Sequence, residues 1–352
     1  MASFNPNAVG QPNGNYFALP SYTPEEAQIV LISVPWDVTT SYRTGTSQGP
    51  ESMIEASAQI DLYDAYIPNA WEMKIATLPI DKALGKLNKK ARKTAEEIIA
   101  ALELGTTEGE LAEFIAEVNA ASVEMNQYVY NKAKFFLDKN KLVAVVGGEH
   151  SVPFGLLKAL KKKHETFGIL HIDAHADLRE AYEGFEYSHA SIMYNALHKL
   201  GGITKLVQVG IRDYCEEEAT LIQRDSRIAA YSDASLHEAL FNGKTWAQQC
   251  QEIISQLPDK VHISFDIDGL LPDNCPNTGT PVPGGLSFNQ ATFLLHTLVL
   301  SGKQIIGFDL CEVSPSIDTD NDWDANVGAR LLYKLCGCLQ VGNIQKNNQE
   351  KK

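Results

Sequence analysis

The segment GILHIDAHADL, residues 168–178, contains the pattern that decides the fold. Its first half, residues 168–172, is an apolar run typical of a buried strand. Asp173, His175 and Asp177 follow at alternate positions where that strand should end. Period-two spacing puts these three side chains on one side of the chain. Ligands collect at the carboxyl ends of strands in α/β sheets, so this segment is a candidate site.

The spacing of Asp173, His175 and Asp177 also limits what they can bind. In a fully extended strand they would spread over about 13 Å, at roughly 3.3 Å per residue. That distance is too long for a single metal ion. The chain must therefore curl, or serve two ions, or do both.

Apolar segments of strand length recur along the chain and alternate with helical patterns. Strands are predicted at residues 28–34, 70–80, 141–146, 168–172, 205–211, 228–231, 261–265 and 304–310. Strands that alternate with helices imply an α/β fold with a parallel, helix-covered sheet. With no repeat or linker in view, we expect a flexible N-terminal arm (1–25), one domain (26–342) with a helical insert at about 88–138, and a disordered tail (343–352).

Composition and charge narrow the class of protein. The hydrophobic content of 44% and the charged content of 21% are typical of a soluble globular protein. The net charge of −14 argues against nucleic acid or an anionic membrane as a partner. It agrees with a cationic small-molecule substrate, because a negative field gathers cations. The six cysteines lack CxxC spacing, which favours reduced thiols in a cytoplasmic protein.

Polar side chains stand out at the ends of four predicted strands. They are His150, the group Asp173, His175 and Asp177, the pair Asp266 and Asp268, and Glu312. Each alone has an ordinary explanation, such as a turn or a helix cap. Together they place two imidazoles and four aspartates at one edge of a parallel sheet. Clustered carboxylates repel one another and mostly protonate unless cations balance them, so the set predicts two divalent ions.

The types of ligand indicate a metal and a reaction. Carboxylate oxygens with two imidazoles and no thiolate favour Mn²⁺ before Zn²⁺, with Ni²⁺ and Co²⁺ also open. Two ions roughly 3.5–4 Å apart can share a water and lower its pKa, which gives a hydroxide near neutral pH. Such a nucleophile attacks a planar, electrophilic carbon. The sequence therefore predicts metal-assisted hydrolysis.

Six motifs, in order along the chain, resemble the arginase/agmatinase (ureohydrolase) family and are most like agmatinase. They are GGEHS at 147–151, DAHAD at 173–177, SHAS at 188–191, SFDIDGL at 264–270, TGTPVPGGL at 278–286 and EVSP at 312–315. The resemblance implies a three-layer α/β/α domain with a central parallel sheet of about eight strands. It also implies two Mn²⁺ per chain, hydrolysis of a guanidino compound to urea and an amine, and a homo-oligomer, either a trimer or a hexamer.

The resemblance implies two sets of metal ligands that share two carboxylates. One ion would be held by His150, Asp173, Asp177 and Asp266, and the other by His175, Asp173, Asp266 and Asp268. Asp173 and Asp266 would therefore bridge the two ions.

Three further positions match family residues that handle the substrate. His189 matches a proton shuttle, which the chemistry needs because the leaving amine must be protonated; without the resemblance it reads as a surface loop histidine. Glu312 matches the residue that binds the guanidinium, whose planar fork suits a carboxylate. Thr280 matches a position that helps to hold the same group. His171, two residues before Asp173 on the same strand, is expected to support the ligands or to fill the core.

The loop after the ligands should meet the tail of the substrate. It contains Arg179, Glu180, Glu183 and Glu186. Three glutamates suit the cationic amine of agmatine, whereas Arg179 leaves a carboxylate tail open. Arg179 and Glu180 are the candidate tail contacts, and we expect agmatine to be cleaved to putrescine and urea. Arginase, guanidino-acid hydrolase and formimidoylglutamase activities are alternatives.

A catalytically silent homologue that acts as a binding subunit is a further alternative, from a different class. Loss of a metal ligand or of the shuttle would signal it, and neither is lost.

Overall fold

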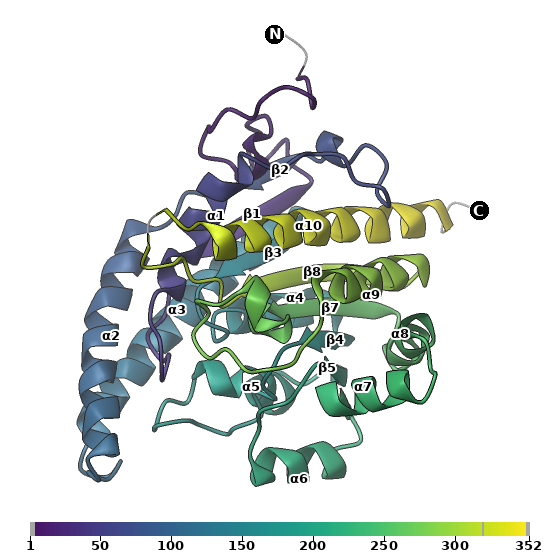
Figure 1. Cartoon of the computed structure of the whole chain (residues 1–352). Coiled ribbons are helices and arrows are strands. Elements are labelled where there is room, and N and C mark those ends of the chain that lie inside the picture. Colours follow the sequence, from purple (N-terminus) through teal and green to yellow (C-terminus); the bar gives the residue numbers. More distant parts are fainter. Residues whose placement is uncertain (1–3, 319, 350–352) are drawn as a thin grey trace.

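Eight parallel strands form one sheet at the centre of the computed structural model, which describes residues 4–318 and 320–349 (Figure 1). The strands are β1 (Ile29–Val34), β2 (Ile75–Thr77), β3 (Leu142–Gly147), β4 (Phe167–Ile172), β5 (Ile203–Val209), β6 (Ile228–Tyr231), β7 (Lys260–Asp266) and β8 (Gln304–Cys311). Their order across the sheet is β2-β1-β3-β8-β7-β4-β5-β6. The predicted α/β fold with a central parallel sheet is confirmed.

Helices cover both faces of this sheet. They are α1 (Gly49–Ser57), α2 (Lys82–Glu103), α3 (Ala112–Asp138), α4 (Phe154–His164), α5 (Ile192–Lys199), α6 (Glu216–Arg224), α7 (Asp233–Phe241), α8 (Trp246–Ser255), α9 (Phe288–Leu300) and α10 (Trp323–Gln349). None of the helices in the described part of the chain is both long and apolar enough to cross a membrane.

The apolar side chains form two cores, one on each face of the sheet. Successive strand residues point to opposite faces, so Ile29 and Leu31 join a core with α1, α8, α9 and α10. Val30 and Ile32 join the other core, with α2, α3, α4 and α5. Figure 1 shows α9 and α10 on one side of the sheet and α4 on the other. This arrangement gives the three layers that the resemblance implies.

Both ends of the chain are more ordered than predicted. Within the expected flexible arm, Tyr16, Phe17 and Leu19 are buried, because large apolar side chains gain free energy when they leave water. The backbone N–H of Phe17 also donates to Ser57 Oγ at 2.7 Å. At the other end, α10 extends to Gln349, into the predicted disordered tail. Residues 1–3 and 350–352 of these two segments lie outside the described residues.

Helix α2, part of the predicted insert, supports the loop that follows β1. The side chain of Asn88 accepts from the backbone N–H of Asp37 at 2.8 Å. Arg92 Nη1 donates to the carbonyl oxygens of Val38 and Thr40, at 3.1 and 2.5 Å. These bonds give buried polar backbone groups of the loop hydrogen-bond partners, and so they hold the loop in place. They also connect α2 to the carboxyl edge of the sheet.

Helix α3 supports the loop that follows the candidate ligands. Asn119 Nδ2 donates to the carbonyl of Gly184 at 3.1 Å, and its Oδ1 accepts from the N–H of Glu186 at 2.8 Å. Glu183 has a φ of 54°, and its Oε2 is buried without a hydrogen-bond partner among the described residues. Burial raises the pKa of Glu183 to about 7, against the opposing effect of Arg92. Glu183 therefore lies near α2, which carries Arg92.

The raised pKa of Glu183 predicts a pH-dependent stability. Between its ordinary value of about 4.3 and the folded value, the folded state binds more protons than the unfolded state, so stability falls as pH rises. A Glu183→Gln variant does not titrate. It should therefore unfold at a higher temperature than the parent at pH 8, and the gap should narrow towards pH 4.5.

Thermal unfolding of both proteins from pH 4.5 to pH 8 measures this effect. The exposed Glu180 of the same loop provides the matched control, because Glu180→Gln should follow the parent at every pH. A gap between Glu183→Gln and the parent that stays constant with pH would contradict the assignment.

Candidate metal centre

Four neighbouring strands in the middle of the sheet end at the candidate centre. In sheet order they are β3, β8, β7 and β4. His150 follows β3, Glu312 follows β8, and Asp266 ends β7. Because all four strands are parallel, their carboxyl ends meet at one edge. The structure therefore brings together every polar group that the sequence placed at a strand end.

The six predicted ligands form two overlapping groups. His150 Nδ1 lies 3.0, 3.1 and 3.3 Å from carboxylate oxygens of Asp173, Asp177 and Asp266. His175 Nδ1 lies 3.1 Å from Asp268 Oδ2 and 3.5 Å from Asp173 Oδ1. Asp173 thus offers one oxygen to each group. Ligands about 2.1 Å from one ion lie about 3 Å apart when they meet at right angles, so these donors fit the spacing of two metal sites.

The chain reaches both groups because it curls after β4. Asp177 has a φ of 54°, a left-handed conformation that costs an ordinary residue about 1–2 kcal/mol. The Asp177 Oδ2 atom is buried and has no hydrogen-bond partner among the described residues. The DAHAD segment therefore does both of the things that its spacing allowed: it curls, and it serves two sites.

Burial and charge make this edge of the sheet unfavourable without cations. Burial, and then the neighbouring Asp173, raise the pKa of Asp177 to about 6. Burial, and then the charge of Asp268, raise the pKa of Asp266 well above its usual range. A divalent cation stabilises the ionised form of carboxylates whose pKa is raised in this way. The donor set and its electrostatics therefore fit a metal pair.

A buried network behind His150 fixes its orientation, and sequence analysis missed it. His150 Nε2 lies 2.8 Å from Ser264 Oγ, which donates to Asp309 Oδ1 at 2.9 Å. Asp309 Oδ2 lies 2.6 Å from His262 Nε2. Because the Ser264 hydroxyl proton goes to Asp309, His150 Nε2 donates and Nδ1 is left unprotonated towards the carboxylates. This is the tautomer that a metal ligand needs.

His171 supports Asp173 in a similar way, as expected from its place in β4. Its Nε2 lies 2.8 Å from Asp173 Oδ2. Its Nδ1 accepts from Gln208 Nε2 at 3.0 Å, and that amide also donates to the carbonyl of Ala176. The signal for these supports is in the sequence, since each is a polar residue within an otherwise apolar strand.

His189 is held by a hydrogen-bonded chain that includes two residues without a predicted role. Its backbone N–H donates to Thr39 Oγ1 at 3.0 Å, and its Nδ1 lies 3.3 Å from the same oxygen. Thr39 Oγ1 donates to Glu149 Oε1 at 2.8 Å. Because that hydroxyl proton is used, Nδ1 of His189 donates and Nε2 is the basic nitrogen. Burial, and then the charge of His175, lower the pKa of His189 to about 3, so the ring is neutral at physiological pH.

Glu312 is positioned with one oxygen held and the other free. Its backbone has a φ of 63°, and its Oε1 accepts from the N–H of His150 at 2.8 Å. Its Oε2 is buried and has no hydrogen-bond partner among the described residues. Burial, and then the charge of Glu149, raise the pKa of Glu312 well above its usual range. A cationic group at Oε2 would stabilise the ionised form of the Glu312 carboxylate and offset the unfavourable effect of its burial.

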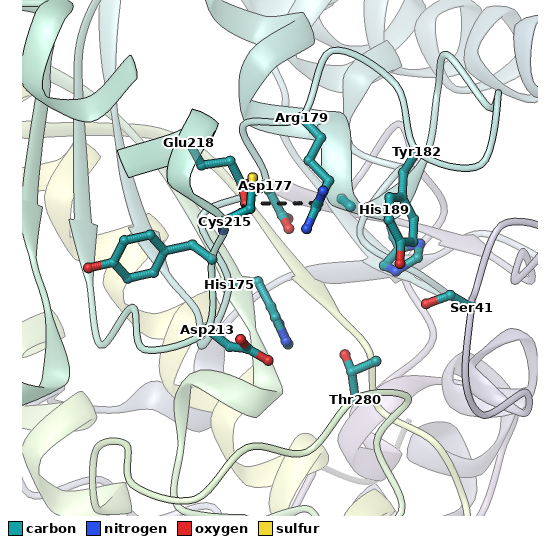
Figure 2. Close-up of a pocket in the computed structure, with 12 residues that line it drawn as sticks. Ser41, His175, Asp177, Arg179, Tyr182, His189, Asp213, Cys215, Glu218 and Thr280 are labelled. Carbon is teal, nitrogen blue, oxygen red and sulfur yellow. Dashed lines mark hydrogen bonds and ion pairs between the residues drawn. The ribbon is translucent and has the colours of Figure 1, made fainter. Parts of the chain in front are cut away.

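A cavity of about 370 Å³ opens onto the centre (Figure 2). Its lining residues are Ser41, His175, Asp177, Arg179, Tyr182, His189, Ala190, Asp213, Tyr214, Cys215, Glu218 and Thr280. The predicted contacts Arg179 and Thr280 line it, and Glu180, which is exposed, does not. This size suits a small-molecule ligand.

Besides Asp177, two carboxylates line this cavity, and both come from the segment after β5, which sequence analysis did not consider. Asp213 and Glu218 line the cavity, whereas Glu186 forms an ion pair with Lys199 instead. Glu218 accepts from the backbone N–H groups of Leu178 and Cys215, at 3.0 and 2.9 Å. Its side chain is therefore fixed.

Among the described residues that line the cavity, Arg179 is the one arginine or lysine. Its Nε lies 3.8 Å from Glu218 Oε2, and its guanidinium lies 4.8 Å from the centre of the Tyr182 ring. Figure 2 shows Arg179 between Glu218 and Tyr182. The pair with Glu218 reduces the charge that Arg179 presents to a ligand.

Comparison with known proteins agrees with the motifs. The family model described as "Arginase family" matches residues 27–337. The chain is 31% identical over 328 residues to the N(1)-aminopropylagmatine ureohydrolase of Thermus thermophilus, with 92% of this chain and 94% of that protein covered. It is 28% identical over 312 residues to the agmatinase of Bacillus subtilis, with 88% and 91% covered.

Solved structures give the same result for the fold. The agmatine ureohydrolase of Thermoplasma volcanium has a TM-score of 0.67 to this chain at 23% identity, with 91% of this chain and 92% of that chain covered. The proclavaminate amidino hydrolase of Streptomyces clavuligerus has a TM-score of 0.70 at 21% identity, with 96% and 100% covered. Since the family model spans most of the chain, the protein belongs to the arginase family.

Proposed function

We propose that this protein is a ureohydrolase that holds two divalent metal ions and cleaves agmatine, or a close derivative, to urea and an amine. The observation that carries the proposal is the pair of overlapping ligand groups, which share Asp173. The free Oε2 of Glu312 at the same edge supports a cationic guanidinium as the group that reacts. The names of the relatives support an agmatine-like substrate.

The donor set supports manganese. Four aspartates and two histidines supply oxygen and imidazole ligands without a thiolate, which suits Mn²⁺. When bound, the ions supply Lewis acidity and lower the pKa of a water molecule. Asp173, which offers one oxygen to each group, and Asp266, whose Oδ2 lies 3.3 Å from His150 Nδ1, would both help to hold the ions.

The protein's own residues orient the substrate and move a proton. Glu312 Oε2 would accept an N–H of the guanidinium, a charge-assisted hydrogen bond in a site with little water. Thr280, across the cavity, would contact the same group. His189 Nε2 is the basic nitrogen and would exchange a proton with the leaving amine. The chain Glu149–Thr39–His189 keeps the ring in the orientation that this transfer needs.

The tail of the substrate would meet Asp213 and Glu218. Away from the predicted metal ligands, the cavity is lined by two carboxylates, Asp213 and Glu218, and by one guanidinium, that of Arg179. Negative charge therefore exceeds positive charge in this part of the cavity, which favours a cationic tail. This charge balance supports an amine-bearing substrate, although the acidic residues differ from the glutamates that the sequence pointed to. Arg179 over the Tyr182 ring favours the second candidate, a guanidino acid with a carboxylate tail.

The first prediction from the proposed function concerns metal content. The parent should bind two ions per chain, and Asp266→Asn or Asp173→Asn should lose at least one of them and nearly all activity, because a bridging carboxylate supplies both charge and geometry. Elemental analysis measures the ions. Asp213→Asn, in the cavity but outside the ligand groups, should keep both. An active parent with one ion, or none, would exclude the two-metal proposal.

The second prediction concerns His189. His189→Ala should retain both metals and lose kcat by about 10²–10⁴-fold if the ring transfers a proton. Steady-state urea release measures kcat. The matched control is His198→Ala, an exposed histidine on α5, which should keep full activity. A His189→Ala enzyme as fast as the parent would return His189 to an ordinary loop residue.

The third prediction concerns the substrate tail. The kcat/KM for agmatine should exceed that for arginine or 4-guanidinobutyrate, because a tail charge left without a partner is costly. Asp213→Asn should raise the KM for agmatine only a few-fold, since an exposed ion pair contributes about 0.2–1 kcal/mol. Equal or greater efficiency on either acid would overturn the agmatine assignment and leave the ureohydrolase proposal standing.

A further inference from the structure

A second hollow lies at the opposite edge of the sheet, where β1, β3 and β8 begin. Its volume is about 490 Å³. It is lined by Ala27, Gln28, Leu137, Lys139, Asn140, Lys141, Leu142, Lys163, His164, Gln304, Ile306, Gln340 and Asn343. These residues come from the amino ends of the three strands, the ends of α3 and α4, and the last part of α10. The hollow is therefore separate from the candidate metal centre.

The charge of this hollow is opposite to that of the whole protein. The chain has 44 acidic and 30 basic residues, yet the lining contains three lysines, one histidine and no aspartate or glutamate. One of these lysines, Lys139, has a carboxylate nearby, with its Nζ 3.5 Å from Glu25 Oε1. A concave, positively charged surface attracts anions and excludes cations.

Lys141 and Lys163 are oriented by neutral groups. Lys141 Nζ donates to the carbonyl oxygens of Glu25 and Ala27. Lys163 Nζ donates to the carbonyl of Leu137 and to Asn140 Oδ1. Carbonyl and amide oxygens fix the direction of an ammonium group without cancelling its charge. Among the described residues, neither lysine forms an ion pair, although the negative charge of Asp138 acts on Lys163. Two of the three N–H groups of each ammonium are used, so each has one N–H left for a ligand.

The side-chain amide of Gln340 is a third polar group in the lining of this hollow. Its Oε1 is buried and has no hydrogen-bond partner among the described residues. A half-turn of the amide exchanges its oxygen and its NH₂, so Gln340 can accept from a hydroxyl or donate to an oxygen. Two fixed ammonium groups and one adaptable amide suit a group with several oxygens, such as a phosphate, better than a single carboxylate oxygen pair.

We propose that this hollow binds a small phosphate-bearing anion, held by Lys141, Lys163 and Gln340. The hollow is concave, which suits a free small molecule better than a lipid surface, because a lipid surface needs a flat or protruding face. These three residues come from the position before β3, from α4 and from α10. The class of ligand follows from the lining alone and does not depend on the proposed function.

Calorimetric titration of the metal-loaded protein with inorganic pyrophosphate tests the proposal, with sodium chloride at equal ionic strength as the reference. Saturable binding is expected. Lys163→Gln should weaken it about ten- to hundred-fold, the loss that follows from one charged hydrogen bond. Lys162→Gln, the exposed neighbour outside the hollow, should bind like the parent. Asp266→Asn should also bind like the parent, which separates the hollow from capture of the anion by the metal centre.

Gln340→Glu gives a second, independent readout. The substitution keeps the shape of the side chain and places a carboxylate beside the two lysines. It should abolish pyrophosphate binding and raise the melting temperature of the ligand-free protein, because it compensates their charges. Lys163→Gln could destabilise the end of α3, because Lys163 donates to the carbonyl of Leu137. Gln340→Glu retains Lys163, so it tests the proposal in that case as well.

Three results would overturn the proposal. They are no saturable binding of pyrophosphate beyond that of chloride, binding that survives both Lys163→Gln and Gln340→Glu, and binding to phosphatidylglycerol vesicles without binding to free pyrophosphate.

Discussion

Repulsion among four buried aspartates at one edge of the sheet is the constraint on which the rest of the structure depends. Asp173, Asp177, Asp266 and Asp268 are each at most 4% exposed. Removing a carboxylate from water costs several kcal/mol unless opposite charge and hydrogen bonds compensate it. Three histidines, His150, His171 and His175, and a few backbone N–H groups compensate only part of that cost. A bound cation would compensate the rest, which explains why two neighbouring strands, β7 and β4, bring four aspartates to one point.

The sheet supports this charge through its interior as well as at its edge. His262, Ser264 and Asp266 occupy alternate positions of β7, so they share one face, and Asp309 on β8 completes the network behind His150. Hydrogen bonds from His150 and His262 outweigh burial and lower the pKa of Asp309 to about 2. A permanent negative charge behind His150 strengthens it as a ligand. Polar residues inside buried strands are therefore part of the centre.

The sequence was sufficient to predict features that depend on local pattern, such as the positions of strands. It was not sufficient to predict features that depend on which elements lie next to each other in space. Apolar runs located the strands, and their ends located His150, Asp173, Asp266 and Glu312. The sheet order β3-β8-β7-β4 is a tertiary property that spacing does not contain. The loop glutamates show the same limit, because their side chains could be assigned to the substrate or to the insert only after α3 was seen to bind Gly184 and Glu186 through Asn119.

Helices α2 and α3 therefore take part in the arrangement of the cavity. Arg92 of α2 fixes the loop that carries Thr39, and Thr39 contacts His189. Asn119 of α3 fixes the loop that carries Tyr182. The two helices pack on each other, and α3 packs closely on α4, where a side chain at Gly155 would come within 2.5 Å of the Asn126 carbonyl. Close packing of this kind transmits strain from one element to the next. The residue that would transfer the proton and the loop beside the substrate tail thus share one rigid support, so a change in the insert would affect both.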